Sequence, residues 1–153
     1  MKEIKLTKGL SVQVDDCNYQ WLNQWNWYAQ KGHNTYYAAR RDKNCKLIYM
    51  HRIILDTPEN LQVDHKDHNG LNCQGYNIRN CTHQQNQMNQ SSRCASGYLG
   101  VRKTPCGNFR ANIKTNDKCF YIGTYKTKEL AALAYNNKAI QLFGEFANLN
   151  NVL

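Results

Sequence analysis

The sequence predicts an α+β fold in which a β-rich N-terminal region leads into a polar centre and then into a three-stranded antiparallel sheet packed on one helix. Residues 1–55 hold short runs in which apolar and polar residues alternate, which is the period of a strand with one buried face. Residues 98–125 hold three more such runs joined by short turns, and an apolar stripe at helical spacing follows. A chain of 153 residues accommodates one domain or two small ones.

The N-terminal region begins with a predicted hairpin that turns at Lys8-Gly9. Its apolar positions are Ile4, Leu6, Leu10, Val12 and Val14. Asp15-Asp16 is expected to cap a short helix that carries Trp21, Leu22 and Trp25. Strands are then expected at Trp27-Tyr28 and Tyr36–Ala38. We expect the aromatic residues of this region to lie in the core.

A basic turn follows these strands and precedes a further apolar segment at residues 47–55. The basic residues of interest there are Arg40, Arg41 and Lys43. A basic hairpin can lie along a phosphate backbone, although a solvated turn explains the same charges equally well.

The central stretch, residues 63–89, is rich in Asp, His and Asn and has almost no aliphatic residues. A core segment is not built in this way, because each buried amide or imidazole needs a partner. The pair Asp64-His65 is expected at the end of a strand, and Thr82 is expected to cap a helix over residues 84–89 that carries Asn86. Carboxylate and amide oxygens suit Mg²⁺ or Mn²⁺, and a neighbouring His can take a proton from water. This combination predicts metal-assisted phosphodiester hydrolysis.

The charge distribution supports a polyanionic partner. The net charge of +9 divides into +5 for residues 1–55, −2 for residues 56–90 and +6 for residues 91–153. Basic flanks around an acidic centre suit a protein that holds a polyanion with its flanks and a cation at its middle. General solubility is the alternative explanation for an excess of basic residues.

Several classes of protein are disfavoured by the sequence. The seven cysteines include no CxxC pair, so a structural zinc site is not indicated, and reduced thiols are expected. The chain has neither an apolar run of membrane-spanning length nor an apolar N-terminal signal. We therefore expect no membrane partner and a location in the cytoplasm of a bacterial or phage-infected host cell.

The C-terminal region follows a polar linker at residues 91–96. Strands are expected over residues 98–103, 108–114 and 118–125, and an amphipathic helix from the N-cap Thr127 to Gly144 is expected to cover one face of their sheet. The stripe on this helix comprises Leu130, Leu133, Ala134, Asn137 and Ile140. The other sheet face would expose polar and basic residues, and such a face can enter a major groove.

Residues 47–89 resemble the HNH endonuclease module of phage and intron homing enzymes. The matching motifs are His51-Arg52, Val63-Asp64-His65, Asn69-Gly70-Leu71-Asn72, Asn77-Ile78-Arg79 and Gln85-Asn86-Gln87-Met88-Asn89. The three letters of the family name fall on His65, Asn77 and Asn86, with Asn at the third position, a common variant. The resemblance implies a ββα-metal nuclease core within a domain of residues 1–90.

The resemblance also implies roles for individual residues. Asp64 and Asn86 would bind one divalent cation, Mg²⁺ or Mn²⁺, and His65 would be the general base for the attacking water. Asn77 would hold the loop after His65 and orient its imidazole, and His51 would be a structural or phosphate contact. The expected products carry a 5′-phosphate and a 3′-hydroxyl.

One departure from the family pattern separates two functional hypotheses. The family often shows Asp-Asn-Arg where this chain has Asn72-Cys73-Gln74. The departure favours a DNA-binding regulator whose nuclease centre has decayed. The intact Asp64, His65, Asn77 and Asn86 favour an active, site-specific endonuclease acting on double-stranded DNA. One centre of this kind cuts one strand, so we expect a nicking monomer, or a dimer if both strands are cut.

Residues 97–150 resemble the Apetala/ethylene-response-factor type of DNA-binding domain. The matching residues are Gly100-Val101-Arg102, Phe109-Arg110-Ala111, Ile122-Gly123-Thr124-Tyr125, Glu129-Leu130-Ala131-Ala132, Ala134-Tyr135, Ala139, Gly144 and Leu149-Asn150. In that family the sheet lies in the major groove. The corresponding contacts here would be Arg102, Lys103, Arg110, Asn112 and Lys114. Thr104 and Cys106 stand where the plant proteins usually have Arg and Trp, so the plant target sequence does not carry over.

Overall fold

A computed structural model of the chain describes residues 1–88, 95–115 and 118–152. It has the predicted α+β class, and the chain divides into two compact units, Met1–His83 and Gln84–Leu153. Most of the predicted linker 91–96 lies outside the described residues, as does Asn89, so the domain limits 1–90 and 97–150 stay predictions. Across the described residues the structure has no helix whose length and apolar content would let it cross a membrane.

The first unit opens with the predicted hairpin. Strands β1 (Lys2–Lys5) and β2 (Ser11–Val14) pair antiparallel around the 3-10 turn η1 (Thr7–Gly9), and the buried side chains of Ile4 and Val12 face each other. Helix α1 (Asp16–Leu22) follows at its predicted start. The Asp15 side chain does not cap this helix as expected. Its carboxylate instead accepts a hydrogen bond from the backbone N–H of Gly75 at 2.7 Å.

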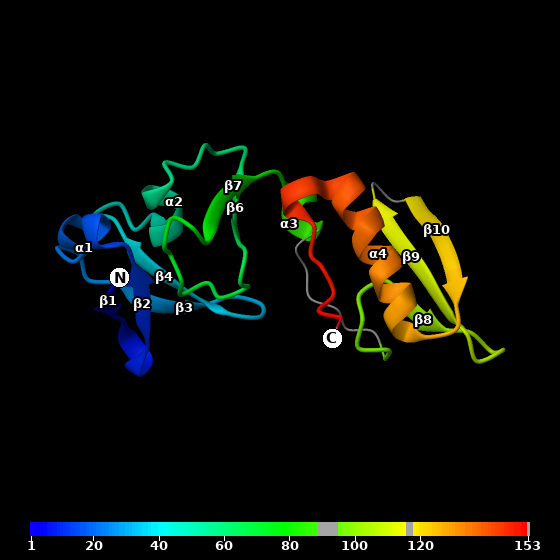
Figure 1. The fold of residues 1–153 in the computed structure, drawn as a ribbon. Coiled ribbons are helices and arrows are strands. Elements are labelled where there is room, and N and C mark those ends of the chain that lie inside the picture. The colour runs from blue at the N-terminus through cyan, green and yellow to red at the C-terminus, as the bar shows by residue number, and fades with distance from the viewer. Residues whose placement is uncertain (89–94, 116–117, 153) are drawn as a thin grey trace. The chain divides into compact units, whose positions relative to one another are not determined.

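A second sheet consists of β3 (Tyr28–Lys31), β4 (Tyr36–Arg41) and β5 (Leu47–Tyr49), and the short helix α2 (Met50–Ile54) follows it (Figure 1). Trp27 is buried in the core of this unit, and its indole N–H donates to the Leu22 carbonyl at 2.8 Å. The expectation that all aromatic residues here are core is wrong for Trp21 and Trp25, which are 38% and 43% exposed. Helix α1 turns Leu22 inward, and Trp25 follows after the helix has ended.

The central stretch forms β6 (Gln62–His65), β7 (Ile78–Cys81) and α3 (His83–Met88). Strands β6 and β7 pair antiparallel as a separate two-stranded sheet, with the long loop of residues 66–77 between them (Figure 1). Their register sets Asp64 opposite Arg79 and His65 opposite Ile78. This register places the side chain of Arg79 beside Asp64, and it places both ends of the loop of residues 66–77 next to His65.

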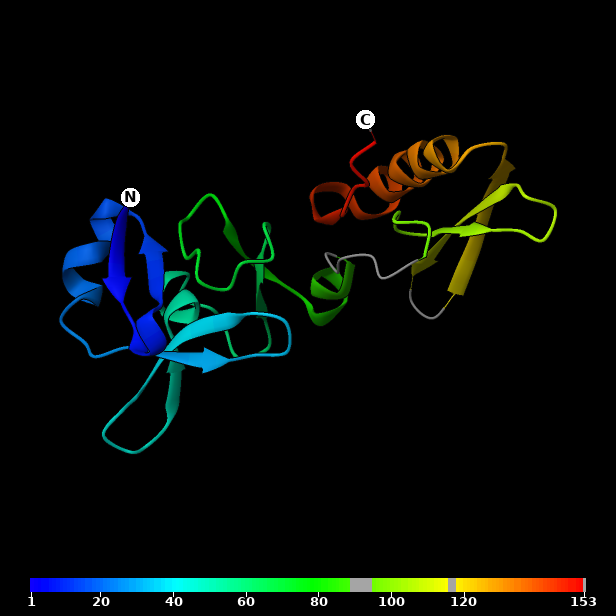
Figure 2. The same ribbon diagram turned by 90° about the horizontal axis from the view of Figure 1, so that it is seen from below.

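The second unit is the predicted sheet and helix. Strands β8 (Val101–Lys103), β9 (Phe109–Thr115) and β10 (Lys118–Tyr125) form an antiparallel sheet in the order β10-β9-β8, and α4 (Lys128–Phe143) covers one of its faces (Figures 1 and 2). The Thr127 hydroxyl caps α4 by accepting from the Leu130 N–H at 3.2 Å, as predicted. The helix ends before Gly144, whose φ is 54°, and the turn η2 (Gly144–Phe146) follows.

The face of α4 that meets the sheet differs from the expected stripe. Its buried residues are Ala131, Ala132, Tyr135 and Ala139. Leu130 and Ile140 of the expected stripe are 50% and 51% exposed. The reason is the short distance between layers, because a Cβ at Gly100 would lie 2.3 Å from the Tyr135 ring. Small side chains let helix and sheet approach this closely, and leucines at the same positions would not fit.

Candidate active site

Asp64 and His65 occupy the end of β6 and are both buried. Asp64 is only 3% exposed, and the side chain of Arg79 lies against it from the facing strand. The Nε and Nη2 atoms of Arg79 lie 2.8 Å and 2.7 Å from Oδ2 of Asp64. A carboxylate this deeply buried requires a cationic partner, because desolvation of an unpaired charge costs several kcal/mol.

The imidazole of His65 packs among aromatic rings. Its centroid lies 5.1 Å from that of His51 in an edge-to-face arrangement and 5.7 Å from that of Tyr37. Burial lowers the pKa of His65 to about 4, against the opposing effect of the Asp67 and Asp64 carboxylates. The ring is therefore neutral at pH 7, and one of its nitrogens carries a lone pair that can accept a proton.

Asn77 holds the loop that follows His65. Its side chain is almost fully buried, and its Nδ2 donates to Asp67 Oδ1 at 2.9 Å and to the Asn72 carbonyl at 2.8 Å. Its Oδ1 accepts from the backbone N–H of Asp67 at 3.1 Å. Burial alone would raise the pKa of Asp67, but hydrogen bonds from Asn69, Asn72 and Asn77 lower it overall. One amide thus binds both ends of the six-residue segment 67–72 of the loop.

The same loop is joined to β2 in the N-terminal hairpin. The backbone N–H of Gln13 donates to the Leu71 carbonyl at 2.8 Å, and the Gln13 carbonyl accepts from the Cys73 N–H at 2.8 Å. These two bonds form a parallel bridge between Gln13 and Asn72. Together with the hydrogen bond between Asp15 and Gly75, these bonds attach the loop to residues 13–15, which lie far from the loop in the sequence.

Three of the four predicted nuclease residues, Asp64, His65 and Asn77, lie in the first unit. Asn86 lies on α3 and belongs to the second unit, where its side chain is half-buried. Sequence reasoning assigned no role to Asp67, Asn72 or Arg79, although Asn72 and Arg79 stand in the motifs that carry the family resemblance. The signal for Arg79 was the strand register, which the uncertain pattern around residues 77–80 did not reveal. The signal for Asp67 and Asn72 was the Asx-turn spacing of the loop.

The predicted basic arm has one half-buried residue, Arg40, and two exposed residues, Arg41 and Lys43. The Arg40 guanidinium lies 4.2 Å from the Trp25 ring and 5.6 Å from the Trp27 ring. Cation–π contacts of this kind hold the side chain against the protein. Arg41 is exposed and donates to the Cys45 carbonyl at 2.8 Å, and Lys43 is exposed in the turn between β4 and β5.

The predicted recognition face lies on the side of the C-terminal sheet that α4 does not cover. Ala111 and Ile113 of β9 are buried toward the helix, so the alternate residues Arg110, Asn112 and Lys114 occupy the opposite face. Arg102 pairs directly with Arg110 and shares this face. Lys103 instead pairs with Phe109, which packs with the core. Lys103 is exposed but starts from the helix side of the edge strand.

An aromatic side chain adds to this face. Tyr121 lies opposite Asn112 in the sheet and is 62% exposed. The Arg110 guanidinium lies 5.4 Å from the centroid of its ring. Arg110 also lies directly opposite Arg102. Two arginines in this arrangement repel each other unless an anion screens their charges, so this surface is suited to a polyanion.

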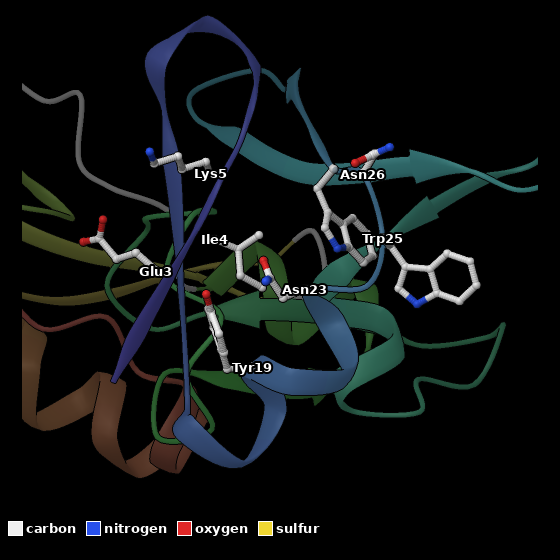
Figure 3. Close-up of a pocket in the computed structure, with 8 residues that line it drawn as sticks. Glu3, Ile4, Lys5, Tyr19, Asn23, Trp25 and Asn26 are labelled. Carbon is white, nitrogen blue, oxygen red and sulfur yellow. The ribbon is translucent and has the colours of Figure 1, made fainter.

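A separate pocket lies between β1, α1 and the segment before β3 (Figure 3). Its lining consists of Glu3, Ile4, Lys5, Tyr19, Asn23, Trp25, Asn26 and Trp27. This lining includes no predicted catalytic or metal-binding residue. The chemistry of the Asp64-His65 pair therefore does not depend on this pocket.

The carboxylate of Asp64 on β6 and the amide of Asn86 on α3 are both hard oxygen donors. A carboxylate and an amide oxygen are ligands that Mg²⁺ and Mn²⁺ prefer. Asp64 is already held rigidly by Arg79, and hydrogen-bonded carboxylates of this kind make well-oriented ligands.

Comparisons with known proteins show which families the chain is similar to. The family profile described as HNH endonuclease matches residues 56–88. An uncharacterised HNH endonuclease of Acanthamoeba polyphaga mimivirus is 36% identical over 146 residues, which cover 95% of this chain and 77% of the viral protein.

A second group of relatives is similar to part of the chain. The ethylene-responsive transcription factor LEP of Arabidopsis thaliana is 35% identical over 75 residues, which cover 48% of this chain and 36% of the plant protein. Ethylene-responsive transcription factor 1 of Solanum lycopersicum is 43% identical over 56 residues, which cover 35% of this chain and 23% of the tomato protein.

Proposed function

The chain belongs to the HNH endonuclease family, and from that premise we propose that it is a metal-dependent, site-specific DNA endonuclease of the nicking, homing type. The observation that carries the proposal is the buried Asp64-His65 pair at the end of β6, beside a loop that Asn77 holds. A hard oxygen donor and a neutral imidazole on adjacent residues provide a metal ligand and a base for one reaction.

In the proposed mechanism His65 accepts a proton from the attacking water. Its neutral imidazole has a lone pair for this purpose at pH 7. Asp64 and Asn86 would hold Mg²⁺ or Mn²⁺, and the bound ion would supply positive charge to stabilise the leaving 3′-oxygen. The water oxygen bonds to phosphorus and the bond to the 3′-oxygen breaks, which gives 5′-phosphate and 3′-hydroxyl ends.

Two other residues position these groups. Arg79 holds the Asp64 carboxylate through two contacts to one oxygen. Asn77 binds Asp67 and Asn72 and so keeps the loop after His65 in one conformation. Rigid support of this kind is what keeps a catalytic group within reach of its target.

For DNA recognition we assign the open face of the C-terminal sheet. The contacts to double-stranded DNA would come from Arg102, Arg110, Asn112 and Lys114 on this face, and from Lys103, which is exposed on the edge strand but starts from the helix side. The similarity of part of the chain to plant ethylene-responsive transcription factors supports this assignment, as does the exposure of the basic residues. Arg41 and Lys43 are the members of the N-terminal arm best exposed for phosphate contacts, with Arg40 held between indole rings.

The test is incubation of supercoiled plasmid with the full chain and Mg²⁺ or Mn²⁺, with EDTA as the control. We expect conversion to nicked circles that EDTA abolishes. Ends that a DNA ligase reseals would support the proposed 5′-phosphate and 3′-hydroxyl products. Binding without any cleavage in either metal would contradict the proposal.

A second candidate function is a DNA-binding regulator with a decayed nuclease centre. The observation that favours it is the replacement of the family's Asp-Asn-Arg by Asn72-Cys73-Gln74. In the same plasmid experiment this candidate predicts retained DNA binding and no cleavage. The cytoplasmic location stays a prediction.

A further inference from the structure

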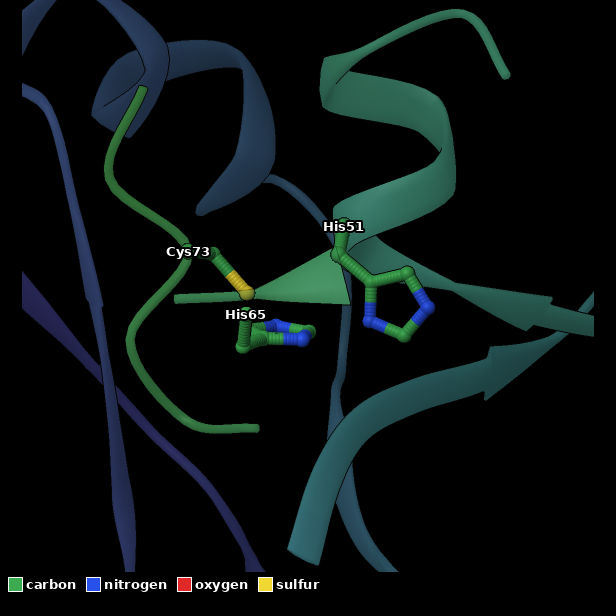
Figure 4. Close-up of side chains that lie close together, drawn as sticks. All are labelled: His51, His65 and Cys73. Atoms are coloured by element: carbon green, nitrogen blue, oxygen red, sulfur yellow. The ribbon is translucent and has the colours of Figure 1, made fainter. Parts of the chain in front are cut away.

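Three buried side chains from separate segments of the first unit, one of them His65, lie close together (Figure 4). His51 comes from α2, His65 from β6 and Cys73 from the loop that Gln13 and Asn77 hold. One donor atom from each lies within 4.8 Å of the other two. Around a tetrahedral Zn²⁺, two ligand atoms stand roughly 3.5 Å apart, so rotamer adjustments of roughly 1 Å would close the cluster around a cation.

The cluster offers a different ligand chemistry from that of Asp64. Imidazole nitrogens and a thiolate are soft or borderline donors that select Zn²⁺ and disfavour Mg²⁺. Nδ1 of His51 is buried and has no hydrogen-bond partner among the described residues. A buried polar atom of this kind is costly unless something binds it. His51, His65 and Cys73 are each less than one-tenth exposed.

Cys73 also stands at the departure from the family pattern. Where the family often has Asp-Asn-Arg, this chain has Asn72-Cys73-Gln74, so the departure adds a soft ligand next to the catalytic loop. The Cys73 sulfur lies 4.0 Å from the Gly70 carbonyl, its hydrogen-bond acceptor. On binding, a divalent cation would form a bond to this sulfur, and the thiol proton would leave to solvent.

We propose that His51, His65 and Cys73 form an inhibitory site for Zn²⁺ or a similar thiophilic divalent cation. A neutral imidazole has a single nitrogen lone pair. When the cation occupies the lone pair of His65, that residue can no longer accept a proton from water. The proposal of a cation site depends only on the geometry of the cluster. The proposal that the cation inhibits depends also on the proposed function, in which His65 is the base.

Binding is tested with Co²⁺ as a spectroscopic substitute for Zn²⁺. The full chain is used with Cys17, Cys45, Cys94, Cys106 and Cys119 replaced by Ser, so that the two buried cysteines remain. We expect one equivalent of Co²⁺ to give a thiolate-to-metal charge-transfer band in the near ultraviolet. Cys73→Ala should abolish the band, and the matched buried control Cys81→Ala should keep it.

A second variant separates coordination from folding. His51→Gln should keep the thiolate band but weaken Co²⁺ affinity about tenfold or more, because even the loss of a hydrogen-bond partner of a ligand costs about that much. Circular dichroism of each variant without metal shows whether its fold is retained. The site is overturned if the background chain gives no band, or if a folded Cys73→Ala variant keeps it.

Inhibition is tested by adding Zn²⁺ to plasmid nicking in excess Mg²⁺, with each variant compared with its own zinc-free rate. One equivalent of Zn²⁺ should suppress nicking by the chain with Cys73, and Cys73→Ala should need about tenfold more. Nicking that persists in a chain saturated with Co²⁺ or Zn²⁺ would overturn the inhibition. A chain that never nicks would contradict the proposed endonuclease, and the Co²⁺ spectrum would still decide the site.

Discussion

Two adjacent residues in β6 have opposite surroundings because of the strand geometry. Successive side chains of a strand point to opposite faces, so Asp64 meets Arg79 across the sheet while His65 packs against the rings of Tyr37 and His51. The first environment pairs a carboxylate with a guanidinium, and the second keeps an imidazole neutral. A metal ligand and a base therefore follow each other directly in the sequence.

The first prediction at this scale concerns the proposed base. His65→Ala should lower the nicking rate about a thousandfold, which lies within the usual contribution of a general base, and leave DNA affinity nearly unchanged. Plasmid nicking and an electrophoretic mobility shift measure the two effects. His33→Ala, at an exposed histidine, is the control. Cleavage that survives in His65→Ala would show that another group activates the water.

The buried histidines also predict a dependence of stability on pH. Burial lowers the pKa of His65 to about 4 and that of His51 to about 3. An unfolded histidine titrates near 6.5, so the unfolded chain binds more protons below that pH. This contribution to stability is therefore fully present above about pH 6.5 and is lost as the pH falls toward 4, by on the order of 3 kcal/mol for each of the two histidines.

Urea unfolding at pH 7.5 and pH 5 measures this loss. The variant His33→Gln should leave the difference between the two pH values unchanged, because that side chain is exposed. Equal free energies of unfolding at both pH values would contradict the burial of neutral imidazoles.

At the scale of elements, regular alternation and capping signals made most of the fold predictable. The hairpin of β1 and β2, the three C-terminal strands and the limits of α4 all follow from local patterns. The buried face of α4 did not, because apolar character alone favours leucine over alanine. The close approach of the Tyr135 ring to the backbone at Gly100 determines that small residues of α4 face the sheet. This approach is visible only once helix and sheet are packed together.

The prediction at this scale concerns the sheet face. The double variant Arg110→Ala with Lys114→Ala should weaken DNA binding and make the slope of affinity against salt concentration shallower by about 2, one unit for each lost phosphate contact. Titrations at several salt concentrations measure the slope. Lys126→Ala with Lys128→Ala, at two exposed lysines outside the sheet, is the charge-matched control. An unchanged slope would mean that this sheet does not face the DNA.

At the scale of the molecule, the sequence indicated candidate nuclease residues but did not indicate which side chains surround them. Asp64, His65 and Asn77 could be selected from the polar composition and the family resemblance. The neighbours of His65 could not, because His51 and Cys73 come from other segments of the first unit. Arg79 required the register of β6 and β7, and the pattern around residues 77–80 is too short and polar to predict a strand.

The prediction at this scale concerns the number of strands cut. A chain with one centre should first produce nicked circles, and linear plasmid should appear later from independent second nicks. A time course of plasmid cleavage at several protein concentrations measures the order of products. Linear product that appears without nicked circles, and with a rate that rises as the square of protein concentration, would indicate a dimer.

The bridge between Gln13 and the loop at residues 71–73 has a consequence for how such genes evolve. The stretch that identifies the family lies within residues 56–88, but the order of its loop depends on a strand near the start of the chain. A gene fragment that encodes only residues 56–88 would lack Gln13 and Asp15, so its product would lose the hydrogen bonds that join this loop to the N-terminal hairpin. We therefore expect recombination that keeps the loop in place to carry the first hairpin along with the motif.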